Sequence, residues 1–137
     1  TRPRFLPGSI IDGATLTNVL LAEGCQIRKA QITNSVIGLR SQISDGARID
    51  KSIVMGSDYY DSPNESIPGN IPLGIGANCQ IEGAIIDKNA RLGNNVVIRP
   101  FPRQMEIMTE NWVVQDGIVV IPKDAIIPSG THIEPEN

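Results

Sequence analysis

Aliphatic residues recur every five or six positions along most of this chain of 137 residues. An amphipathic helix would repeat its apolar residues at three and four positions, and a strand at every second one. A step of five or six suits a chain that turns a corner after each short strand, so that three strands complete a triangular coil. Equivalent residues should then return after 16 or 17 positions, in three series. The series are Ile10, Ile27 and Ile43; Leu16, Ile32 and Ile49; and Leu21, Ile37 and Val54. We predict an all-β protein, a three-sided left-handed parallel β-helix of hexapeptide repeats with about five coils.

The predicted corners carry a small residue that follows a residue tolerant of positive φ. Gly24-Cys25 precede the inward Ile27, and Asn89-Ala90 precede the inward Leu92. Gly and Asn adopt left-handed backbone angles at the lowest cost, and a small side chain fits where the sheets converge. The turn chemistry and the hydrophobic period therefore predict the same fold.

The repeat is interrupted twice, near residues 57–72 and near residues 99–116. Both segments are polar and contain proline, which is typical of loops that leave a solenoid. The coil count places the first insertion at the corner after a third side and the second between a second and a third side. Residues 1–8 lack the repeat and are predicted to be a linker from an N-terminal domain, which leaves 9–137 as the β-helix domain.

The bulk properties exclude several classes of partner. A net charge of −3 and a pI near 5.1 give no electrostatic footprint for nucleic acid. No segment approaches the ~20 apolar residues of a membrane span, and no signal-peptide pattern opens the chain. We therefore expect a reducing, cytoplasmic setting.

Cys25 and Cys79 occupy the small-residue slot of the repeat, so we expect buried free thiols rather than a disulfide or a metal site.

Catalytic and metal-binding candidates are few. Hexapeptide β-helices include acyltransferases, which use a histidine base, and a carbonic anhydrase family with a three-histidine zinc site. This chain has one histidine, His132, which should point outward beside the inward Ile133. A hexapeptide acyltransferase is therefore the least favoured hypothesis, and we assign no catalytic residue and no metal ligand. Trp112, in the second insertion, is predicted either to hold that insertion against the β-helix or to contact another subunit.

Segments 85–92 and 120–127 superpose without a gap, and both carry a lysine in the same slot, Lys88 and Lys123. The same slot holds Glu23 and Leu39 in other coils. If these segments stack, the lysines lie one coil apart, at a strand spacing of ~4.8 Å. The two ammonium groups would repel each other, whereas a dianion between them would be attracted to both. The repeat thus suggests an anion site, with two solvated surface lysines as the alternative.

Six segments look like consecutive landmarks of one protein family. They are RPRFLP (2–7), SVIGLRS (35–41), MGSDYY (55–60), IPLGIG (71–76), IIDKNARLG (85–93) and GIVVIPKDA (117–125). Together they resemble the C-terminal domain of ADP-glucose pyrophosphorylase (glucose-1-phosphate adenylyltransferase), and the resemblance covers nearly the whole chain. The segment 99–116 and Pro122 depart from the pattern of that family.

The resemblance implies a tetrameric nucleotidyltransferase that joins ATP and glucose 1-phosphate into ADP-glucose and pyrophosphate for glycogen or starch synthesis. In that family a separate N-terminal domain performs the chemistry with Mg²⁺. Mg²⁺ and ATP therefore belong to that domain, no cofactor is expected in this chain, and the chain alone should be inactive. The implied location is the cytoplasm, or the plastid if the source is a plant.

The resemblance also assigns the β-helix a role in subunit assembly and in allosteric control by phosphorylated metabolites. Lysines that bind the anionic activator in the plant and cyanobacterial branch correspond to Lys88 and Lys123. Asp87, beside Lys88, is expected to orient a basic partner. The main alternative is a purely structural domain that assembles subunits without binding an effector.

Overall fold

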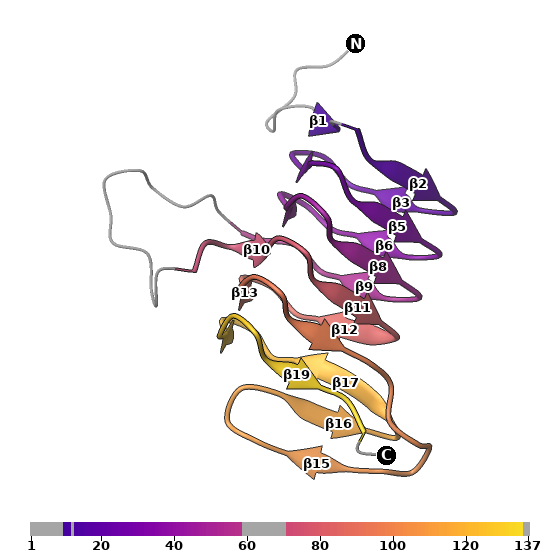
Figure 1. Ribbon diagram of the computed structural model, residues 1–137, viewed down its shortest axis with the longest axis vertical. Helices are drawn as coiled ribbons and strands as arrows, with labels where there is room; N and C mark the ends of the chain where they lie inside the picture. The colour runs from indigo at the N-terminus through magenta and orange to yellow at the C-terminus, as the bar shows by residue number, and fades with distance from the viewer. Residues whose placement is uncertain (1–9, 12, 59–70, 136–137) are drawn as a thin grey trace.

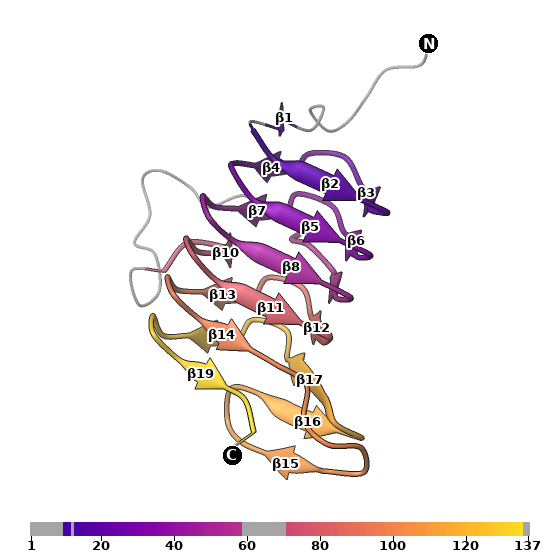
Figure 2. The same cartoon turned by 45° about the vertical axis from the view of Figure 1, so that its right-hand side comes forward.

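The computed structural model describes residues 10–11, 13–58 and 71–135, which form three stacks of short strands around a triangular core (Figures 1 and 2). Sheet A contains β1 (Ile10–Ile11), β4 (Gln26–Ile27), β7 (Gln42–Ile43), β10 (Gly74–Ile75), β13 (Arg91–Leu92) and β18 (Ile126–Ile127). Sheet B contains β2 (Thr15–Thr17), β5 (Gln31–Thr33), β8 (Arg48–Asp50), β11 (Gln80–Glu82), β14 (Val97–Ile98) and β19 (His132–Ile133). Sheet C contains β3 (Leu20–Leu21), β6 (Val36–Ile37), β9 (Ile53–Val54), β12 (Ala84–Ile86), β17 (Ile118–Ile121), β16 (Val113–Gln115) and β15 (Ile107–Met108).

The chain visits sheets A, B and C in turn, which makes it a parallel β-helix. The coils are β1–β2–β3, β4–β5–β6, β7–β8–β9, β10–β11–β12 and β13–β14–β17, followed by β18 and β19. The predicted all-β fold is therefore confirmed. The predicted linker 1–8 and residues 59–70 of the first insertion lie outside the described residues.

The register between coils follows the sequence period except at the first strand. There Ile11, not the predicted Ile10, pairs with Ile27, and Ile11 is 45% exposed because this strand lies at the end of the sheet. Ile27 pairs with Ile43 in sheet A, Ile32 with Ile49 in sheet B, and Ile37 with Val54 in sheet C. These side chains point inward and are buried, as are the small residues at the corners. Because each coil from the second to the fifth contributes one aliphatic residue to each inner face, the core is a continuous stack of aliphatic side chains.

Several corners depend on positive φ, as the turn chemistry predicts. Gly24 and Asn89 have φ of 78° and 61°. Arg40 and Lys51 also have positive φ, although their residue types do not favour it. The stacking of the coils therefore imposes the corner conformation even where the local sequence does not select it.

The second insertion differs from the expected loop. It contains β15 and β16, which pair antiparallel with each other. β16 also pairs antiparallel with β17, so the hairpin extends sheet C at one end of the β-helix (Figure 1). Asp116 and Gly117, with φ of 49° and 78°, form the tight turn between β16 and β17. An Asp-Gly pair between hydrophobic segments is a strong hairpin signal, so the sequence contains evidence for this hairpin although a loop was predicted here. Trp112 stacks on Phe101 with ring centroids 6.4 Å apart, and both rings pack against the core, as the first of its two interpretations predicts.

Both cysteines are fully buried at corners, as predicted. The Cys79 Sγ lies 3.1 Å from the Gly93 carbonyl oxygen, and burial raises the pKa of this thiol. A protonated, inaccessible thiol is a poor nucleophile. We therefore expect neither cysteine to react with an aromatic disulfide reagent in the native protein, and both to react in denaturant. Rapid labelling without denaturant would contradict this burial.

The corner at Gly56 should tolerate no side chain. A Cβ at Gly56 (φ 91°) would collide with the Leu39 carbonyl oxygen of the neighbouring coil, whereas a Cβ at Gly130 (φ 79°) would meet nothing within 4 Å. We expect Gly130→Ala to lower the free energy of unfolding by about 1 kcal/mol, from backbone strain alone. Gly56→Ala should cost about 3 kcal/mol, because overpacking adds to the same strain. Urea unfolding of the two variants measures the difference, and equal losses would contradict the close approach.

Candidate anion site

The two lysines lie at the corner where the chain passes from sheet C to sheet A. At this corner one position, which we call the slot, recurs in every coil. The residue after the slot donates its backbone N–H to the carbonyl oxygen of the slot residue in the preceding coil. Asn89 N donates to Gly56 O at 3.0 Å, and Asp124 N donates to Lys88 O at 3.0 Å. The slot is occupied in turn by Glu23, Leu39, Gly56, Lys88 and Lys123. Lys88 and Lys123 therefore lie on adjacent coils, in the register that the sequence predicts.

Asp58 brings a carboxylate to this pair of lysines. Its Oδ1 lies 3.3 Å from Lys88 Nζ, and the two side chains are 47% and 46% exposed. Within the described residues, Lys123 has no ion pair of its own. The corner therefore combines two ammonium groups with one carboxylate that contacts Lys88.

Asn89 holds Asp58 in place. The backbone N–H of Asp58 donates to Asn89 Oδ1 at 2.8 Å, and Asn89 Nδ2 donates to Asp58 Oδ2 at 3.2 Å. Asn89 itself is 5% exposed and lies at a corner with a φ of 61°. The hydrogen bond from the Asn89 side-chain amide and the ammonium of Lys88 lower the pKa of the Asp58 carboxyl below its ordinary value, so the carboxylate is charged at neutral pH.

Asp87 has a local role in the structure. Its Oδ1 accepts a hydrogen bond from the backbone N–H of Lys88 at 2.6 Å, which fixes the turn that carries the lysine. Its expected role in orienting a basic partner stays a prediction.

Sequence reasoning missed Asp58 and Asn89 as members of this site. The coil count contained a signal for Asp58, because it puts Gly56 in the lysine slot and Asp58 two residues later.

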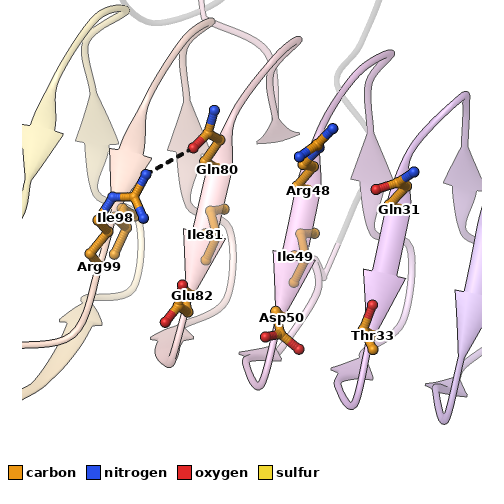
Figure 3. A pocket seen from close by; sticks show the side chains of 10 residues that line it. All are labelled: Gln31, Thr33, Arg48, Ile49, Asp50, Gln80, Ile81, Glu82, Ile98 and Arg99. Atoms are coloured by element: carbon orange, nitrogen blue, oxygen red, sulfur yellow. Dashed lines mark hydrogen bonds between the residues drawn. The ribbon is translucent and has the colours of Figure 1, made fainter.

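A second polar surface lies on the outer face of sheet B, shown in Figure 3. It is a shallow groove of about 430 Å³ with Arg48 and Asp50 on β8, Gln80 and Glu82 on β11, and Arg99 after β14. Arg99 Nη2 donates to Gln80 Oε1 at 3.1 Å, the contact drawn in Figure 3. Arg48 and Arg99 are accompanied in this groove by the acidic Asp50 and Glu82.

His132 is exposed on the outer face of sheet B, as predicted, with Nδ1 2.8 Å from Glu134 Oε2. Over the described ranges, no group of three or more His, Cys, Asp or Glu side chains is placed to hold a metal ion. The same part of the chain contains no helix with the length and apolar character needed to cross a membrane.

Comparison with known proteins identifies relatives of this chain. The chain is 45% identical over 139 residues to the glucose-1-phosphate adenylyltransferase small subunit, chloroplastic/amyloplastic, of Triticum aestivum. That match covers 97% of this chain but 29% of the wheat protein, so the chain spans less than a third of the length of this relative. The family model of the GLGC left-handed parallel β-helix domain matches residues 4–132. The resemblance found in the sequence is thus confirmed, and the chain belongs to the family of GLGC left-handed parallel β-helix domains.

Proposed function

We propose that this chain is the C-terminal regulatory and assembly domain of a glucose-1-phosphate adenylyltransferase, and that it binds a phosphorylated effector at Lys88 and Lys123. The observation that carries the effector site is the stacking of these two lysines on adjacent coils at one corner. The parent enzyme would convert ATP and glucose 1-phosphate to ADP-glucose and pyrophosphate, the activity in the name of the wheat relative. The reaction serves glycogen or starch synthesis.

The chemistry of a phosphate group fits this corner. A phosphate monoester carries a charge of about −1.5 to −2 at neutral pH and offers three strong acceptor oxygens. Two ammonium groups one coil apart can each donate to a different oxygen, so the ligand replaces their mutual repulsion with two charge-assisted contacts. The half-exposed Lys88 side chain is accessible to such a ligand.

The rest of the parent protein would supply the catalytic chemistry. Mg²⁺ and ATP belong to a catalytic domain N-terminal to this one, and no residue of this chain is assigned to them. The chain by itself is therefore expected to be inactive. The plastid named for the wheat relative suggests a plastid location for a plant source and the cytoplasm otherwise.

The effector site can be tested in the intact adenylyltransferase that carries this domain. We expect Lys88→Ala and Lys123→Ala each to raise the effector concentration for half-maximal response about tenfold, because each removes one charge-assisted contact. The Michaelis constants for ATP and glucose 1-phosphate should change little. Lys29→Ala, which removes an exposed lysine after β4, is the matched control. Unchanged effector curves in both variants would overturn the site.

An outer-face feature of sheet C supports the second part of the proposed function, assembly. One outward residue from each strand forms a straight column, which we call the aliphatic stripe. It consists of Leu20, Val36, Ile53, Ile85, Val120, Val113 and Met108. All seven are exposed or half-buried, with Leu20 72% and Met108 86% exposed at the two ends.

The other two sheets have a different outer face. The corresponding column of sheet B includes Gln31, Arg48 and Gln80, and that of sheet A includes Gln26 and Gln42. An apolar column on one sheet alone marks an interaction surface. Seven strands at ~4.8 Å give it a length of about 29 Å, comparable to the width of a standard interface of ~800 Å² per partner.

We assign the aliphatic stripe to contact with a second copy of this chain. A straight, uniformly apolar column is complementary to itself under a two-fold rotation, which is the usual symmetry of a homodimer. This contact would be one of the interfaces of a homotetramer.

Charged substitutions in the aliphatic stripe test this contact. We expect Val36→Lys and Ile53→Lys to reduce the oligomer of the intact enzyme to a smaller species in sedimentation velocity, because burying an unpaired ammonium opposes association. Gln31→Lys, at an outward position on sheet B, is the control. An unchanged oligomer in both stripe variants would exclude this face as a subunit contact.

A further inference from the structure

The position of Asp58 is built into the fold rather than being an accident of two flexible side chains. Asp58 belongs to the third coil and Lys88 to the fourth, so the contact joins neighbouring coils. The preceding residue, Ser57, is buried, and its carbonyl oxygen accepts a hydrogen bond from Arg40 Nη1 at 3.2 Å. Asn89 binds both the backbone N–H and the carboxylate of Asp58. The carboxylate is thus delivered to Lys88 from a fixed backbone.

The glycine in the third coil makes this arrangement possible. Gly56 fills the slot that holds lysine in the next two coils, and its backbone approaches Leu39 too closely for any side chain there. The third coil therefore cannot contribute a cation in the slot. It contributes instead, two residues later, an anion.

From this geometry we infer that Asp58 is an internal competitor for the anion site, a carboxylate that a phosphorylated effector must displace from Lys88. The inference rests on the proposed effector site at Lys88 and Lys123. One carboxylate provides a single negative charge, and its two oxygens are already directed at Lys88 and Asn89. A phosphate dianion brings more charge and a third oxygen, so it can contact Lys88 and Lys123 together.

Displacement is feasible because the ion pair is half-exposed. Water can solvate the released carboxylate, and exposed ion pairs contribute little net stability. Competition of this kind has two consequences. It raises the concentration of anion needed to fill the site, and it discriminates against singly charged anions, which gain no charge advantage over the resident carboxylate.

The experiment is a titration of this chain with inorganic phosphate, followed by NMR of its backbone amides at constant ionic strength. We expect Asp58→Asn, which keeps the shape of the side chain and removes its charge, to tighten phosphate binding about tenfold. Asp50→Asn, on sheet B, removes the same charge at a distance from the corner and should leave binding unchanged.

Asn89→Gly provides an independent variant. Glycine keeps the positive φ of residue 89 but removes both hydrogen bonds to Asp58. Binding should tighten, by less than in Asp58→Asn, because the carboxylate is released but still charged. A role confined to structure would predict weaker binding, since loss of order at the corner would separate the lysines.

The double variant Lys88→Ala/Lys123→Ala separates this inference from the proposed function. If it still binds phosphate like the wild type, the effector site itself is wrong. If it loses binding while Asp58→Asn binds phosphate no more tightly than the wild type, the site stands and the competitor role of Asp58 is overturned. Equal tightening in Asp58→Asn and Asp50→Asn would attribute the effect to net charge and would also overturn it.

Discussion

The structure depends on the hydrogen-bonded register between successive coils. Each coil donates and accepts backbone hydrogen bonds along three parallel sheets and across the corners, as in Asn89 N to Gly56 O and Asp124 N to Lys88 O. This ladder converts a sequence separation of 16 or 17 residues into direct contact, as in the pairing of Ile27 with Ile43 and Leu16 with Ile32. Core packing and the placement of charged side chains both follow from it, because a residue's neighbours are fixed by its place in the coil.

The candidate anion site is a consequence of this register at one corner. Gly56, Lys88 and Lys123 occupy one slot in consecutive coils, and the absence of a side chain at Gly56 leaves room for the backbone contact that the coils require. Asp58 then meets the lysine of the next coil. The two lysines and the Asp58 carboxylate are therefore brought together by backbone geometry. In the proposed site, a phosphorylated ligand would exchange one exposed ion pair for another.

The three sheets have similar inner faces and different outer faces. Sheet B exposes a mixture of arginine, glutamine and carboxylate side chains, whereas sheet C exposes the aliphatic stripe from Leu20 to Met108. The β15–β16 hairpin lengthens this stripe by two strands. The insertion is thus an extension of one face of the β-helix, and it adds apolar surface where the other two sheets have none of comparable length.

The sequence by itself determined the β-helix, the buried cysteines and the stacking of Lys88 on Lys123, because these follow from one period that is legible in the order of residues. It also determined the three aliphatic series, except that Ile11 stands where Ile10 was predicted. It carried an unused hairpin signal in Asp116-Gly117. Only the tertiary structure decided that Asp58 and Asn89 join the lysines and that the outward residues of sheet C line up with those of the hairpin. Those contacts depend on how side chains and an inserted segment fill the space between coils, and a hydrophobic period specifies the inner face of each coil but not what meets on its outer surface.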